Sequence, residues 1–86
     1  MTLPIPSVEA GVIDVLKNVS RRPIEPQRDS DLIADLGFDS LQVIETVSEL
    51  EDRFDISIPM DDVPSIRTVA QVVEHVARLV DARSAP

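Results

Sequence analysis

The sequence lacks most of the residues on which protein chemistry commonly relies. Its 86 residues include no cysteine, one histidine, two glycines and two phenylalanines, with no tyrosine or tryptophan. The absence of cysteine excludes disulfides and thiolate metal sites, and it fits a reducing compartment. No glycine-rich loop for binding phosphates is present. We expect one small domain over 1–86, with a core at about 7–81 and frayed termini.

Long apolar runs and a basic start are also missing. The first six residues have neither a basic segment nor a continuous apolar one, so they do not resemble a signal peptide. No apolar run approaches the length that crosses a bilayer. The net charge of −8 argues against nucleic acid and anionic membranes as partners, because their phosphates would be repelled. We therefore expect a cytoplasmic protein.

The acidic residues are concentrated in one segment. Between Asp39 and Asp62 there are eight acidic residues and one basic residue, Arg53, so this segment carries −7 of the net −8. A solvated helix face explains such a cluster, and so does a surface that attracts basic partners. The sequence leaves both interpretations open.

Apolar residues recur at helical spacing in three stretches, which predicts an all-α protein. A first helix should begin at Ser7 as its N-cap, with Glu9 in the first turn. A second helix should run over about 40–54, and a last helix should follow its cap, Thr68, and fray from Arg83 onwards. The residues predicted to face inward are Val8, Val12, Ile13, Leu16, Val19, Val43, Val47, Leu50, Phe54, Val69, Val72, Val73, Val76, Leu79 and Val80.

The connections between these helices are less regular. A long loop over 21–31 leads into a short turn. Three apolar residues are expected to anchor that turn to the core: Leu32, Ile33 and Leu36. Residues 56–59 are interpreted as a loop with two buried isoleucines, and Asp61 and Asp62 favour one helical turn that Pro64 limits. The prediction is a four-helix bundle of three main helices and one short third helix, whose small aliphatic core is compatible with a pocket between helices.

Ser40 stands where the long loop is expected to become the second helix. As a catalytic nucleophile it would need a general base. The one histidine, His75, falls beside core positions of the last helix, so we interpret it as a packing or surface residue. The acidic residues lack the spacing of a calcium loop. The sequence therefore predicts no catalytic residue and no metal site.

An attachment point is the better interpretation of the Ser40 hydroxyl. A phosphodiester there would lie over the unpaired N–H groups of a first helical turn, where the helix dipole favours negative charge. Gly37 would supply the backbone freedom needed just before the serine. Asp39 or Ser40 as a plain helix N-cap is the alternative, and the tripeptide Asp-Ser-Leu alone favours that alternative because it is too short to be specific.

Four segments give this serine a wider context: LGFDSL at 36–41, LEDRF at 50–54, ISIP at 56–59 and IRTV at 66–69. Glu45 and the pair Asp61-Asp62 stand between them. Together they resemble the acyl carrier protein family over 32–80 without a gap. The resemblance implies the four-helix bundle of that family, which agrees with the helices predicted above.

The resemblance also implies a function that is not enzymatic. Ser40, flanked by Asp39 and Leu41, would accept 4'-phosphopantetheine from coenzyme A through a magnesium-dependent phosphopantetheinyl transferase. The chain would be a discrete, monomeric carrier that holds acyl or aminoacyl cargo as a thioester in fatty acid, polyketide or related biosynthesis. Acyl or aminoacyl ligases and transferases with basic docking surfaces would bind Ile44, Glu45, Glu51, Asp52, Asp61 and Asp62.

Five residues depart from the family pattern: Phe38, Gln42, Ser48, Pro64 and Arg67. They bear on which partners dock and which cargo is carried, not on the attachment itself. A stand-alone amino-acid carrier remains open, as does an acidic helical interaction module without a prosthetic group. A small hydrolase built on Ser40 ranks last, because no credible base lies near the serine in the sequence.

Overall fold

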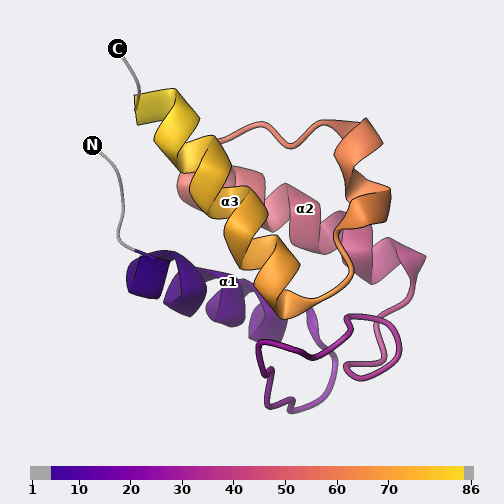
Figure 1. Cartoon of the computed structure of the whole chain (residues 1–86). Helices are drawn as coiled ribbons and strands as arrows, with labels where there is room; N and C mark the ends of the chain where they lie inside the picture. Colours follow the sequence, from indigo (N-terminus) through magenta and orange to yellow (C-terminus); the bar gives the residue numbers. More distant parts are fainter. Residues whose placement is uncertain (1–4, 85–86) are drawn as a thin grey trace.

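The computed structural model describes residues 5–84, and this part of the chain is helical (Figure 1). Three α-helices, α1 (Ile5–Val19), α2 (Ser40–Phe54) and α3 (Val69–Ser84), are joined by loops and one short 3₁₀ helix, η1 (Met60–Ser65). The predicted bundle with a short third helix is confirmed. Within 5–84 there is no strand, and no helix is long and apolar enough to cross a membrane.

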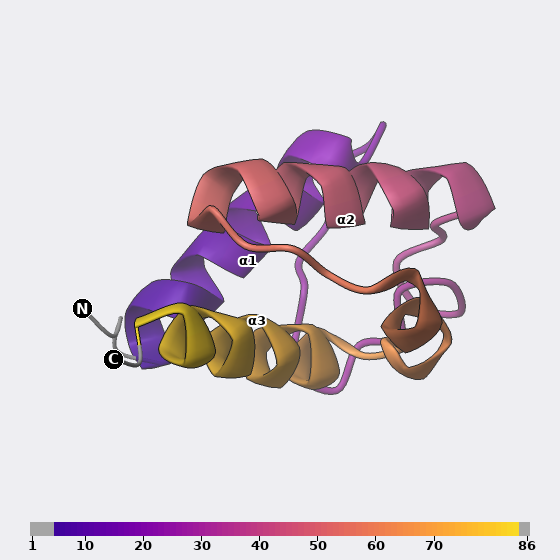
Figure 2. The same cartoon turned by 90° about the horizontal axis from the view of Figure 1, so that it is seen from above.

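The helix α1 packs against both α2 and α3, which touch each other less. Figure 2 shows α1 crossing behind the other two helices, while the segment that contains η1 runs from the end of α2 to the start of α3. The core is aliphatic apart from two phenylalanines. Its buried apolar residues are Val8, Val12, Val15, Leu16, Val19, Leu32, Leu36, Phe38, Leu50, Phe54, Ile58, Val69, Val72, Val73, Val76 and Val80.

The start of α1 and the end of α3 both differ from the predicted helix bounds. The helix α1 starts at Ile5, so the prediction of Ser7 as N-cap is wrong; Pro6 has no N–H to leave unpaired and fits a first turn. Glu9 lies beyond that turn and binds Arg28 of the loop at 2.9 Å. At the other end of the chain α3 continues past the predicted limit: Arg83 is helical and pairs with Asp55 at 3.2 Å, and fraying of this end stays a prediction. Residues 1–4 and 85–86 lie outside the described part.

The buried face of α2 begins one residue earlier than the predicted stripe. Gln42 and Thr46 are buried together with Leu50 and Phe54, whereas Val43 and Val47 are only partly buried. Gln42 turns inward because it takes part in the helix cap described below. The predicted buried stripe is therefore right for Leu50 and Phe54 and is shifted by one residue at Val43 and Val47.

The loop before α2 is hydrogen-bonded to the start of α3. Leu32 donates its N–H to the carbonyl of Arg67 at 2.9 Å, and Val69 donates to the carbonyl of Ser30 at 3.0 Å. Leu32 and Leu36 are buried as predicted, but Ile33 is 60% exposed, so its prediction as a core anchor is wrong. These backbone bonds fix the turn with Ile33 facing outward.

Candidate functional site

The N-terminus of α2 is closed by a capping box. The Asp39 carboxylate accepts the backbone N–H of Gln42 at 2.8 Å, and the Gln42 side-chain oxygen accepts the backbone N–H of Asp39 at 3.1 Å. Ser40 is the first residue of the helix and is exposed. Gly37 precedes it with φ of 75°, in the left-handed region that favours glycine. Asp39 is thus the N-cap, and the cap does not use the Ser40 hydroxyl.

Ser40 opens onto a groove of about 460 Å³. The groove lies between α2, the turn that follows Asp31, and the segment from η1 to the start of α3. Most of its lining is apolar, and this explains the exposure of Ile33 and Met60, which both lie in its wall. Its lining residues are Asp31, Leu32, Ile33, Ser40, Val43, Ile44, Met60, Val63, Pro64, Ile66 and Arg67.

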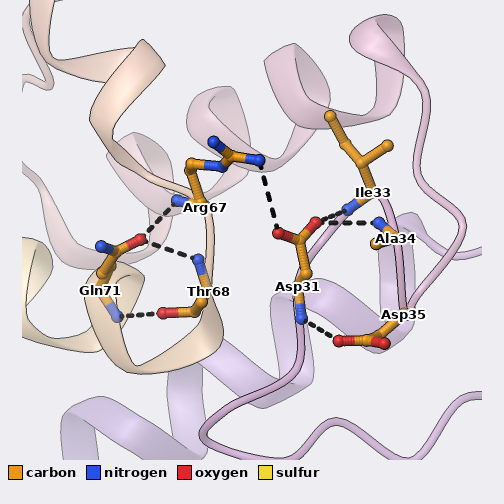
Figure 3. A network of polar contacts seen from close by, with 7 residues as sticks. All are labelled: Asp31, Ile33, Ala34, Asp35, Arg67, Thr68 and Gln71. Atoms are coloured by element: carbon orange, nitrogen blue, oxygen red, sulfur yellow. Dashed lines mark hydrogen bonds and ion pairs between the residues drawn. The ribbon is translucent and has the colours of Figure 1, made fainter.

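One carboxylate of the groove wall is held in place by the backbone (Figure 3). Asp31 accepts the N–H groups of Ile33 and Ala34 at 2.9 Å each, while its own N–H donates to Asp35 at 2.7 Å. The Arg67 guanidinium lies 4.0 Å away. The hydrogen bonds from Ala34 and Ile33 lower the pKa of Asp31, and the positive charge of Arg67 adds to that effect. Asp31 is therefore an ionised, oriented group in the groove wall.

The apolar residues predicted beside the serine lie at the surface. Leu41 is 56% exposed and Ile44 is 53% exposed, and Ile44 also lines the groove. Both extend the apolar wall of the groove onto the outer face of α2.

The predicted acidic partner residues fall into two groups. Asp52 and Asp61 are exposed and Glu45 is partly buried. Glu51 instead accepts the backbone N–H of Ile58 at 2.8 Å. Asp62 lies 3.1 Å from the ring nitrogen of His75, so these last two carboxylates contribute to the fold.

The position of His75 does not support hydrolysis at Ser40. The His75 ring is mostly buried and its Nε2 contacts Asp62, which ties η1 to α3. The residue does not line the groove that contains Ser40. No cluster of three or more metal-ligating side chains occurs within residues 5–84. The interpretation of His75 as a packing residue is confirmed.

Two buried polar residues have structural roles that the sequence pattern did not predict. Gln42 is buried, and besides the cap its side-chain nitrogen donates to the carbonyl of Val19 at 3.4 Å. Thr46, also buried, donates its hydroxyl to the carbonyl of Gln42 at 2.8 Å. The spacing Asp39-x-x-Gln42 is a signal that was available, because it places a side-chain amide at the third position of the helix.

Comparison with known proteins identifies the family of this chain. A family model described as a phosphopantetheine attachment site matches residues 10–76. An acyl carrier protein of Syntrophobacter fumaroxidans is 34% identical over 88% of this chain and 95% of its own length. The chain belongs to the acyl carrier protein family. It is a carrier protein of fatty acid or polyketide biosynthesis, and it works with a covalently bound 4'-phosphopantetheine and with biosynthetic enzymes.

Solved structures agree with the described fold. An acyl carrier protein structure from Mycobacterium tuberculosis superimposes with a TM-score of 0.78 at 35% identity, covering 83% of this chain and 96% of that one. The acetyl actinorhodin acyl carrier protein of Streptomyces coelicolor gives 0.73 over 88% and 93% of the two chains. At 21% identity it supports the fold alone.

The residues at the start of α2 fit the prosthetic group of this family. An exposed hydroxyl at a helix N-terminus is reachable by another protein, and the adjoining groove would offer apolar walls to an arm attached there. When bound, the group supplies the thiol that this cysteine-free chain lacks.

Proposed function

We propose that Ser40 is the residue that carries 4'-phosphopantetheine. The supporting observation is that Ser40 supplies the one hydroxyl among the residues that line the groove, while Asp39 takes over the capping of α2. An arm attached there begins at the rim of an apolar groove. The groove is then available to shelter the cargo.

Attachment is a phosphoryl transfer carried out by a separate phosphopantetheinyl transferase. The Ser40 oxygen forms a new bond to the phosphorus next to pantetheine in coenzyme A, and the bond to adenosine 3',5'-bisphosphate breaks. A base on the transferase takes the hydroxyl proton, and a magnesium ion balances the charge of the leaving group. Asp39, whose carboxylate adjoins Ser40 in the chain, is suited to help position that ion.

The surface around Ser40 is suited to enzymes with basic docking sites. Leu41 and Ile44 expose apolar side chains beside the attachment point, and Glu45, Asp52 and Asp61 supply negative charge around them. We propose that the transferase and the acyl ligases or transferases of the pathway dock here. Glu51 and Asp62 contribute to this docking less directly, since their carboxylates are already engaged within the fold.

Intact mass after incubation with coenzyme A and a broad-specificity transferase tests the assignment. The wild type should gain one phosphopantetheinyl group and Ser40→Ala should gain none. Ser48→Ala, which removes an exposed serine two turns further along α2, is the matched control and should be modified normally. An unmodified wild type would favour the interaction module without a prosthetic group, and modification of Ser40→Ala would refute the site. Monomeric state, cytoplasmic location and the kind of cargo, including aminoacyl, remain predictions.

A further inference from the structure

Arg67 brings a positive charge into the groove that adjoins Ser40, and we propose that it selects cargo: it favours acyl chains that carry a keto oxygen over saturated chains. The inference rests on the proposed attachment at Ser40. Arg67 is the one cation among the groove-lining residues, whose other members are apolar except for Ser40 and Asp31. A cargo folded into this groove therefore meets a single strong hydrogen-bond donor.

The Arg67 guanidinium has donors to spare. It is 72% exposed, and its contact with Asp31 at 4.0 Å is longer than a hydrogen bond. By contrast, Arg28, Arg53 and Arg83 hold their carboxylate partners at 2.9, 3.1 and 3.2 Å. A guanidinium carries five N–H donors and no acceptor, so Arg67 can serve an incoming oxygen without first breaking a hydrogen bond.

The base of the side chain is nevertheless fixed. The Arg67 backbone N–H donates to the Gln71 side chain at 2.9 Å, and its carbonyl accepts the N–H of Leu32 at 2.9 Å. Figure 3 shows the side chain extending from this anchored backbone toward Asp31. Asp31, itself held by two backbone hydrogen bonds, orients the guanidinium electrostatically at the groove wall.

The charge around the groove favours a neutral ligand oxygen. Asp31 is the one acidic residue in the groove lining, its carboxylate lies 4.0 Å from the Arg67 guanidinium, and the chain as a whole carries a net charge of −8. A carboxylated cargo would meet repulsion from these groups, whereas a ketone accepts a hydrogen bond without adding charge. A saturated chain gains only apolar contact with residues such as Ile44 and Val63.

In the test, a transferase attaches the acylated arm to Ser40 from hexanoyl-coenzyme A or from 3-oxohexanoyl-coenzyme A. The two acyl chains are equally long and differ only in the keto group at C3. The nitrogen-15 signal of the Arg67 side chain is expected to shift with the oxo cargo and not with hexanoyl. Cleavage of the oxo thioester by exchange with a small thiol, relative to the same thioester on free pantetheine, should be about threefold to tenfold slower in the wild type than in Arg67→Gln. Hexanoyl cleavage should be equal in both.

Arg83→Gln, which removes an ion-paired arginine outside this groove, is the matched control and should behave as the wild type. If loading itself fails, as seen by mass, the proposed attachment is overturned together with this inference. If loading succeeds but Arg67→Gln leaves the oxo cleavage rate unchanged, only the inference is overturned. If the nitrogen-15 signal of Arg67 shifts by the same amount in holo protein without cargo, the guanidinium binds the phosphate of the arm and not the keto oxygen. That result also overturns the inference. The nitrogen signal is measured in the wild type, so the test does not depend on how the variant folds.

Discussion

Asp39 combines two physical properties at the residue scale. Its side chain caps α2 by accepting the Gln42 N–H at 2.8 Å, and its charge lies next to the proposed attachment serine. The cap requires only an acceptor oxygen, whereas attraction of a magnesium ion or a basic enzyme requires the charge. Substitutions can therefore separate the two.

Asp39→Ala should destabilise the fold by about 1 kcal/mol through loss of the cap, while Asp39→Asn should keep nearly full stability because asparagine caps as well as aspartate. Urea unfolding measures both. Phosphopantetheine loading should slow in both variants, since each removes the charge. Normal loading of Asp39→Asn would show that the charge is not needed.

Asp31 makes stability depend on pH in one defined window. Its pKa is lowered from the ordinary value of 3.8, chiefly by the N–H of Ala34 and then of Ile33, so the folded state favours the charged form. This contribution is complete above the unfolded pKa and is lost as pH falls through the lower folded pKa. The free energy of unfolding of the wild type should exceed that of Asp31→Asn near neutral pH, and the difference should shrink below about pH 4. A difference that stays constant into acid would contradict the assignment.

At the scale of elements, the approach of α1 to α2 depends on Gly11. The helix interior disfavours glycine, and from the sequence this residue only weakens α1. In the fold, a Cβ at Gly11 would lie 2.6 Å from the ring carbon Cζ of Phe54, which is too close for van der Waals contact. The glycine therefore permits the helices to pack around the Phe54 ring.

Gly11→Ala should destabilise the protein by about 1 kcal/mol net, because overpacking costs about 1–3 kcal/mol and the helix-propensity gain of up to about 1 kcal/mol does not offset it. Thermal unfolding measures the change. Ala10→Gly at the neighbouring exposed position should lose stability through propensity alone. The double variant Gly11→Ala/Phe54→Leu should lose less stability than the sum of the losses of the two single variants, because the smaller side chain leaves room for the added methyl group. A loss equal to that sum would argue against the steric cause.

For the molecule as a whole, the asymmetric charge predicts salt-dependent association. The segment from Asp39 to Asp62 carries −7, and its exposed acidic residues are Asp39 and Asp55 at the two ends of α2, Asp52 on α2 and Asp61 on η1. Long-range attraction of this kind raises association rates and is screened within about 10 Å at 0.1 M salt. Partner enzymes should therefore bind this carrier faster at low ionic strength.

The double variant Glu45→Gln/Asp52→Asn should slow association with the transferase in stopped-flow measurements at low salt, and the difference from the wild type should vanish at high salt. Glu25→Gln/Glu74→Gln removes the same charge from exposed positions outside the segment. If the control slows association equally, net charge and not its location is responsible.

Helical periodicity was enough to predict the elements, because each helix buries one apolar face. It predicted α2 over its full length, and the capping preference of threonine predicted the cap of α3 at Thr68, whose hydroxyl accepts the Gln71 N–H at 3.2 Å. It misplaced Ile33, because the outward direction of that side chain follows from backbone hydrogen bonds to α3. Hydrogen bonds between segments distant in sequence produce no periodic pattern of apolar residues in a turn.

The sequence by itself was enough to indicate the family, to single out Ser40 as the candidate attachment residue and to locate the concentration of charge, since all three depend on residue identity and order along the chain. The tertiary structure alone showed that Asp31 and Arg67, distant in sequence, meet in the groove wall near Ser40. It also showed that Gly11 makes room for Phe54 and that Glu51 is engaged with the loop after α2. The physical reason is that such contacts depend on how the helices approach one another, and that approach is set by packing of the whole core.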